Sequence, residues 1–211
     1  ESNEWAKRAI AEGEAAPDLE TVASGHEFLA ENMTVQGTWK GAAEHALQDI
    51  ALGRQIGSQG RVAWGHFPWA VSSFHMGDSV AALTRFAECV ALCERTGDRR
   101  LQSLMLSHAS LIVLETRDES RALEMIDQAA ALADAVTHVH MRAEASKARG
   151  VYHLRRVEHA LALACFDRCP VLMGASQSQV NPLLTSMEAA EASLASGNLD
   201  RARLHLDAGG A

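Results

Sequence analysis

Cysteine is the residue type in this sequence that is best suited to metal or redox chemistry. The chain has four cysteines, which form two pairs with equal spacing. Cys89 and Cys93 are four residues apart, as are Cys165 and Cys169, so a helix would place both thiols of a pair on one face. Four thiolates would suit a zinc ion. Cys165 follows Cys89 by 76 residues, however, and the repeat described below would separate the pairs by roughly 20 Å, because packed helices lie about 8–10 Å apart. We therefore interpret Cys89 and Cys93 as small core residues, with a metal site or redox sensing as the alternative.

Histidine is the other metal-ligating residue type, and the chain contains ten copies of it. His138 and His140 are two residues apart and diverge on a helix, so they suit a metal only if the local chain is extended. Surface or capping histidines are the interpretation that we favour. His108 could titrate or hydrogen-bond a partner from the inner face of a helical array, or it could be a partly buried residue of the repeat.

Sequence motifs for catalysis are absent from the chain. The dipeptide His26-Glu27 begins like a zinc-protease helix, but Ala30 stands where the second histidine is required. The sequence contains no phosphate-binding loop, no dinucleotide fingerprint and no nucleophile elbow. We therefore predict a protein that is not an enzyme, with no catalytic residue, no metal and no cofactor. A metal-binding or enzymatic protein that uses the histidines and cysteines is the third hypothesis.

Aromatic residues make up only 5% of the chain, yet two of the four tryptophans lie in the segment from Trp64 to Trp69. His66 lies between them, and rings combined with a polar side chain suit a partner groove or a dimer interface. The alternative is that these rings fill gaps that small neighbouring residues leave in the core. Pro68 falls inside a predicted helix, which it would kink or whose start it would delay.

Charge is unevenly distributed along the chain, which has a net charge of −8. This acidic balance argues against nucleic-acid binding, which requires a basic surface. Residues 137–159 are different, because five basic residues there stand against two acidic ones. A basic helix could dock an acidic peptide, a phosphate or the acidic part of a neighbouring subunit. A solvated helix face with charge pairs between successive turns is the alternative.

Composition and periodicity predict that helices position all of these side chains. Alanine accounts for 38 of the 211 residues, which favours helices over strands. Apolar residues recur at helical spacing, as in the stripe Ala122, Ile126, Ala129 and Ala133. We expect eleven helices, at residues 3–14, 18–36, 41–55, 59–76, 79–95, 99–116, 119–135, 138–155, 157–168, 178–196 and 199–207.

A recurring alanine, followed in most copies by an aliphatic residue, organises these helices into a repeat. It occurs at positions 9, 46, 82, 122, 160 and 202, with an average step of about 39 residues. A turn position precedes it, and plausible N-caps follow the turn at Asp78, Asp118 and Asn198. Each unit then holds two helices, which the small alanine allows to cross closely. Stacked pairs bury a continuous apolar face, so we predict an all-α solenoid of antiparallel helix hairpins with about five and a half repeats.

The stretch from Gly77 to Val136 resembles tetratricopeptide repeats. Ser110, twelve residues before Ala122, stands where that family places its small glycine, and His108 stands where it often has asparagine. In the next two units the small position holds Gly150 and Ala190. The long period is similar to that of a long-helix variant found beside output domains in bacterial transcription activators of the maltose-regulator type and in nucleotide and diguanylate cyclases. The resemblance implies a right-handed solenoid.

The resemblance also implies where a partner would bind, because the first helices of the pairs line the concave groove in that family. It assigns this role to Ser107, His108, Leu111, Glu115, Lys147 and Val151. The aromatic segment adds Trp64, His66 and Trp69 as partner-binding candidates. The partner that we expect in the groove is a protein or a peptide.

We predict one domain over residues 1–211 and expect it to be a segment of a longer protein. Its predicted function is a non-catalytic interaction or regulatory module of a cytoplasmic bacterial signalling or transcription-regulatory protein. The second hypothesis is a sensor that binds a small molecule or peptide near Trp64, His66, Trp69 and His108. No apolar run approaches the roughly 18 residues of a membrane span, so we expect no membrane partner. The apolar ends of an open solenoid predict a possible homodimer.

Overall fold

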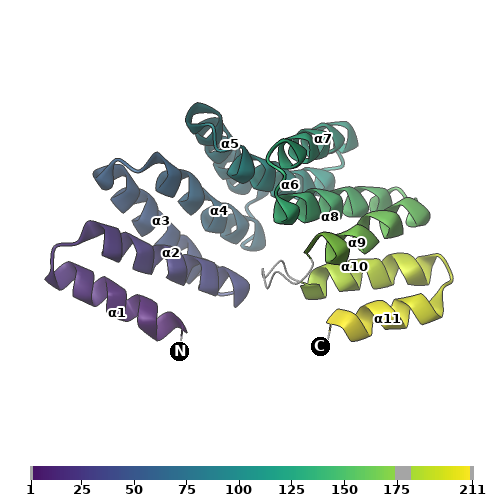
Figure 1. Cartoon of the computed structure of the whole chain (residues 1–211), viewed down its shortest axis with the longest axis horizontal. Coiled ribbons are helices and arrows are strands. Elements are labelled where there is room, and N and C mark those ends of the chain that lie inside the picture. Colours follow the sequence, from purple (N-terminus) through teal and green to yellow (C-terminus); the bar gives the residue numbers. More distant parts are fainter. Residues whose placement is uncertain (1, 174–181, 210–211) are drawn as a thin grey trace. The chain divides into compact units, whose positions relative to one another are not determined.

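The computed structural model describes the backbone of residues 2–173 and 182–209 and the side chains of residues 3–169 and 187–207. Every secondary-structure element in the described backbone is an α-helix (Figure 1), which confirms the predicted all-α class. The helices are α1 (Ser2–Ala15), α2 (Leu19–Val35), α3 (Trp39–Ile56), α4 (Gln59–His75), α5 (Ser79–Thr96), α6 (Arg99–Glu115), α7 (Glu119–Ala135), α8 (Val139–Arg155), α9 (His159–Met173), α10 (Pro182–Ala195) and α11 (Leu199–Gly209).

The helix bounds agree closely with the predicted ranges, apart from those next to the undescribed segment. Helix α9 continues to Met173, beyond the predicted end at residue 168. The predicted start of the next helix, residue 178, lies outside the described residues. Pro68 is buried inside α4, which extends on both sides of it from Gln59 to His75. Pro68 therefore does not delay the start of the helix.

The junctions between helices are evenly spaced along the chain. The side chains of Asp78, Asp118 and Asn198 each accept a hydrogen bond from the backbone N–H three residues later, which confirms these predicted N-caps. The residue before each cap adopts a positive φ, a conformation that glycine takes up without steric cost. Such residues stand at every twentieth position of the described chain, and they are Pro17, Gly37, Gly57, Gly77, Gly97, Arg117, Thr137, Val157 and Gly197.

Two helices therefore make one repeat, and its period of about 40 residues is close to the predicted value of about 39. One buried alanine recurs with this period near the start of each second helix and is at most 2% exposed. Its copies are Ala42, Ala82, Ala122, Ala162 and Ala202. The sequence pattern located three of these five copies. Ala46 is instead buried one turn further along α3, and Ala160 is exposed.

Small residues also recur once per repeat in the first helices of the pairs. The copies are Ala30, Ala70, Ser110, Gly150 and Ala190. A Cβ atom added to Gly150 would lie 2.4 Å from Cε1 of Phe166, so the two helices approach too closely for any side chain at that position. The small position predicted from the family resemblance is thus a point of close helix packing.

The chain divides into two compact units, with the boundary inside α6. Unit 1 comprises Glu1–Met105 and unit 2 comprises Leu106–Ala211. In unit 1, successive helices from α1 to α5 lie side by side, and α2 also contacts α4. In unit 2, successive helices from α7 to α11 pack on one another, and α8 also contacts α10. In the described part of the chain, none of the helices is both long and apolar enough to cross a membrane.

Candidate functional site

A row of polar and aromatic side chains covers the place where α2 and α4 meet in unit 1. Residues at positions 24, 27, 28 and 31 share one side of α2, because they are three or four residues apart. Helix α4 contributes two further side chains. We call this surface the α2–α4 face, and it consists of Ser24, Glu27, Phe28, Glu31, Arg61 and Trp64.

Arg61 is the central cation of this face. Its guanidinium donates to Glu27 Oε2 at 2.6 Å, to Asp49 Oδ1 at 3.0 Å and to Ser24 Oγ at 3.1 Å. Asp49 belongs to α3 and is 1% exposed. Burial raises the pKa of Asp49 to about 7, and the hydrogen bond from Arg61 opposes this rise. The two residues thus connect α3 and α4 through a buried ion pair.

Sequence reasoning missed Asp49, although the repeat contained a signal for it. Positions 89, 129 and 169 stand one, two and three repeats further along the chain and hold Cys, Ala and Cys, all of them buried. A carboxylate at a position that is otherwise small and apolar marks a buried charge that needs a partner. Asp49 can be recognised as an exception only when the period of 40 residues is known, because the pattern in the sequence alone gave about 39.

Trp64 is held across the same face by a hydrogen bond. Its indole Nε1 donates to Glu31 Oε1 at 2.5 Å, and its ring centroid lies 5.9 Å from that of Phe67. Burial raises the pKa of Glu31, and the hydrogen bond from Trp64 partly offsets this effect. Trp64 itself is half-buried, and Phe28 on α2 is exposed. The face therefore presents aromatic surface together with carboxylates.

His66 and Trp69 contact α5 instead, so the aromatic segment contributes to two different surfaces. Their rings stack at 5.9 Å, and the Arg85 guanidinium of α5 lies 3.8 Å from the centre of the Trp69 ring. His66 is buried, which lowers its pKa. Its Nδ1 lies 3.5 Å from Glu88 Oε2 but forms no hydrogen bond within the described residues. Trp69 is half-buried, so the segment serves both the core and the surface.

A second group of charged residues lies between α6, α8 and α10 in unit 2. Lys147 Nζ lies 3.0 Å from Glu144 Oε2, and His108 Nε2 lies 3.7 Å from the same oxygen. Glu144 and Lys147 are both buried; despite this burial, their attraction lowers the pKa of Glu144 and raises that of Lys147. Burial lowers the pKa of His108 to about 4 and raises that of Glu188 to about 7. The structure therefore brings the predicted residues His108 and Lys147 together around Glu144, which sequence reasoning did not identify.

The remaining groove candidates differ in their surroundings. Ser107 is buried, whereas Leu111 and Val151 are half-buried. Glu115 is exposed and forms an ion pair with Arg155 of α8. These partner-binding assignments stay predictions.

Three of the four cysteines are buried between helices, and Cys165 is half-buried. Cys89 and Cys93 are fully buried with their Sγ atoms 3.9 Å apart, and Cys89 donates to the Ala63 carbonyl. Their mutual hydrogen bond and burial raise the pKa of Cys89. Burial likewise raises the pKa of Cys169 to about 12. These surroundings agree with the core interpretation, because a buried thiol with a raised pKa is a poor nucleophile and metal ligand.

Two pairs of histidines lie close together in the described part of the chain. The ring centroids of His138 and His140 are 6.4 Å apart, whereas the Nδ1 atoms of His26 and His45 lie only 2.8 Å from each other. Among the described residues, no three or more His, Cys, Asp or Glu side chains are placed to hold one metal ion.

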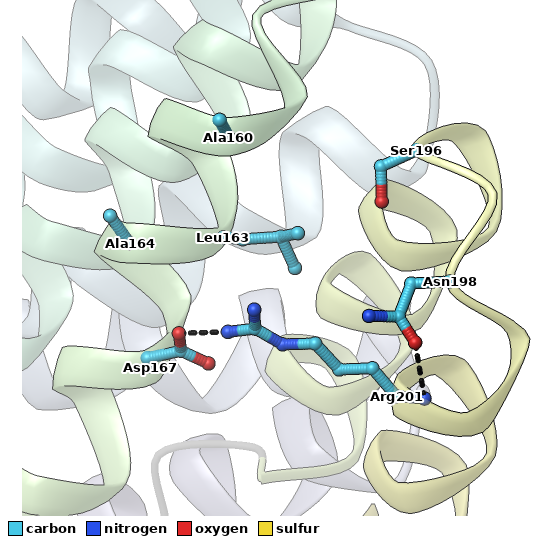
Figure 2. A pocket seen from close by; sticks show the side chains of 7 residues that line it. All are labelled: Ala160, Leu163, Ala164, Asp167, Ser196, Asn198 and Arg201. Atoms are coloured by element: carbon cyan, nitrogen blue, oxygen red, sulfur yellow. Dashed lines mark hydrogen bonds and ion pairs between the residues drawn. The ribbon is translucent and has the colours of Figure 1, made fainter.

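A hollow of about 370 Å³ lies between α9 and α11. Figure 2 shows Arg201 reaching across it to Asp167, with which it forms an ion pair. The backbone N–H of Arg201 donates to the side chain of Asn198, the N-cap of α11. The polar groups of this hollow therefore already have partners within the protein.

Comparison with protein-family models and with curated proteins gives no match. Solved structures do resemble the chain. BtubC (BKLC) from P. vanneervenii has a TM-score of 0.71 and 13% identity over 98% of this chain and 87% of that one. The apo form of RapI has a TM-score of 0.62 and 10% identity over 98% and 96% of the two chains. A putative kinesin light chain from Podosopora anserina, described as having nearly identical TPR-like repeats, has a TM-score of 0.58 and 15% identity over 87% and 91%.

Proposed function

From its tetratricopeptide-like fold, we propose that this chain is a non-catalytic interaction module of a cytoplasmic signalling or transcription-regulatory protein. The partner is a protein or peptide that docks on the first helices of the pairs. The α2–α4 face is the observation that carries this proposal. It combines half-buried and exposed aromatic rings with charged groups, and such mixtures concentrate binding energy in protein interfaces.

Preorganisation of the α2–α4 face supports a binding role. Glu31 holds Trp64, and Glu27 and Asp49 hold Arg61, through hydrogen bonds between helices. Side chains that are fixed before binding lose less conformational entropy when a partner arrives. These hydrogen bonds join the helices and at the same time hold the side chains in place for a partner.

The charge of the face indicates the chemistry of the partner. Two carboxylates of the face, Glu27 and Glu31, outnumber Arg61, and Glu20 next to the face also pairs with Arg61. Phe28 is 51% exposed beside them. We expect a partner segment with an apolar side chain next to lysine or arginine, because its charges would complement the acidic surface.

Selection from a random peptide library tests this proposal. We expect enrichment of apolar residues flanked by basic ones, with binding measured by fluorescence anisotropy of the labelled peptide. Phe28→Ala should weaken binding by at least about tenfold, which corresponds to about 1.4 kcal/mol. Leu161→Ala removes a similarly exposed apolar side chain from α9 and serves as the control. Equal losses in both variants, or unchanged binding to Phe28→Ala, would contradict docking at this face.

A ligand sensor is the second candidate, and His66 is the observation that favours it. Its buried Nδ1 lacks a hydrogen bond within the described residues and lies beside the Trp69–Arg85 stack. A small molecule or peptide with a hydrogen-bonding group could satisfy this nitrogen. Titration of metabolites and short peptides should then quench Trp69 fluorescence in a saturable way, and Trp69→Phe should abolish that response. A flat response to all of them would count against a sensor.

A further inference from the structure

A hollow of about 210 Å³ lies between α7, α8 and α9 in unit 2. It is lined by Arg142 and Arg149 of α8, Arg168 of α9, Asp134 of α7 and three small residues. Three guanidinium groups against one carboxylate give the lining a formal charge of +2, in a chain whose net charge is −8. Two helices thus bring cations together at one place in an acidic protein.

These arginines keep donor groups that the protein does not use. Arg168 is exposed and makes no hydrogen bond or ion pair within the part of the chain that is described. Nε of Arg142 lies 2.8 Å from Asp134 Oδ1, yet this buried N–H has no partner with hydrogen-bond geometry among the described residues. Arg168 therefore offers its donors to an acceptor supplied from outside, and Asp134 is the group that competes with such an acceptor for Arg142.

The existing ion pairs oppose an incoming anion only weakly. Arg142 pairs with Asp134 and Arg149 pairs with Asp127, and the two aspartate side chains are 72% and 58% exposed. Ion pairs with such exposed partners contribute little to stability, because water and salt screen them. The guanidinium groups can therefore turn toward a ligand that carries more charge than one carboxylate.

We propose that this hollow, which we call the arginine hollow, binds the phosphoryl group of a phosphate monoester. Guanidinium groups match phosphate oxygens with paired donors, and a dianion satisfies several of them at once. A hollow of about 210 Å³ has the volume of about seven liquid water molecules, which is room for one phosphoryl group. The phosphoryl group could belong to a small molecule or to a phosphorylated side chain of a partner protein.

Arginine side-chain NMR tests this proposal directly. The Nε–Hε signals of 15N-labelled protein are followed during titration with inorganic phosphate at pH 7.5 and constant ionic strength. We expect saturable shifts for Arg142, Arg149 and Arg168. Shifts that grow linearly, or that are equal at the exposed Arg95 of α5, would overturn the proposal.

Two substitutions in the hollow should change phosphate affinity in opposite directions. Arg168→Ala should weaken binding by about tenfold or more, because it removes one charged donor. Asp134→Asn should strengthen binding several-fold, because it removes the competing carboxylate. Arg95→Ala in unit 1 is the matched control and should change nothing. All three substituted residues are exposed, and far-UV circular dichroism checks that the variants are folded. Equal affinity for Arg168→Ala and Arg95→Ala would refute the site.

Further titrations identify the chemistry and the source of the phosphoryl group. Acetate at the same ionic strength should bind at least tenfold more weakly than phosphate, and equal affinity would exclude selectivity for a phosphoryl group. A phosphoserine peptide that binds tenfold more tightly than phosphate would indicate a protein source. Equal affinity of peptide and phosphate would indicate a small phosphorylated molecule.

Discussion

At the scale of single residues, burial raises the pKa of two carboxyl groups, Asp49 and Glu188, to about 7. The negative charge of Asp49 in unit 1 is compensated by Arg61, whose guanidinium lies 3.0 Å from Asp49 Oδ1. Glu188 in unit 2, like Asp49, has one carboxylate oxygen that is buried without a hydrogen bond among the described residues. Burial raises its pKa to about 7, although nearby Lys147 opposes the rise, and Glu144 adds repulsion. The folded protein therefore binds a proton at Glu188 more tightly than the unfolded chain does.

This proton linkage predicts how Glu188→Gln changes the pH dependence of stability. A raised pKa stabilises the fold below the ordinary value of 4.5, and that contribution is lost as the pH rises through about 7. Glutamine does not titrate, so the variant should gain stability over the parent between pH 5 and pH 8, by roughly 1–3 kcal/mol. Urea unfolding at the two pH values measures the difference. A stability difference that does not change with pH would show that Glu188 keeps an ordinary pKa.

At the scale of the helices, evenly spaced turns separate each helix from the next. Five of the turn residues with a positive φ are glycine, but Arg117, Thr137 and Val157 adopt the same conformation with φ between 51° and 62°. A left-handed backbone costs roughly 1–2 kcal/mol for a residue with a Cβ atom, and a branched side chain makes the conformation less favourable still. The turn between α8 and α9 is therefore strained at Val157.

Val157→Gly should stabilise the protein by about 1 kcal/mol, because glycine relieves this strain. Val157 is 70% exposed, so little apolar contact is lost. The same substitution at the exposed Val80, inside α5, should instead destabilise the protein by a few tenths of a kcal/mol, because glycine is a poorer helix former. Thermal unfolding of both variants distinguishes the two effects. Destabilisation of similar size in both would contradict strain at Val157.

At the scale of the whole molecule, exposed apolar side chains on α11 are the feature that concerns self-association. Leu199, Leu204 and Leu206 are all at least half exposed on this short helix. Leu199 and Leu206, seven residues apart, share one side of α11, whereas Leu204 lies on a different side. Exposed apolar side chains can pair with a second copy of the same surface, and the predicted homodimer would cover Leu204.

Leu204→Glu should therefore weaken self-association. We expect the parent chain to approach twice its mass of 22.7 kDa at high concentration in light scattering, and the variant to stay near the monomer mass. Val80→Glu, which changes a similarly exposed position in unit 1, is the control and should leave the dimer intact. A parent chain that stays monomeric at every concentration would refute the homodimer.

A recurring small residue was enough to reveal the repeat period. Sequence alone was also sufficient for the helices and for three of the N-caps, because these features depend on residues within a few positions of each other. The Asp78, Asp118 and Asn198 caps and the helical apolar stripes are such local features. The buried cysteines also follow from the pattern, because Cys89 and Cys93 occupy core positions of their helix. The alanine register was only partly accessible, since Ala46 and Ala160 satisfy the same local pattern as the true repeat positions.

Only the tertiary structure decided which side chains meet between helices. Trp64 and Glu31 are 33 residues apart, and Arg61 and Glu27 are 34 apart. The arginine hollow joins Arg142 of α8 to Arg168 of the next helix. Such contacts depend on how far one helix is shifted and rotated against its neighbour, which close packing of the small residues sets. Local periodicity places a residue on a face of its own helix, but packing determines what that face touches.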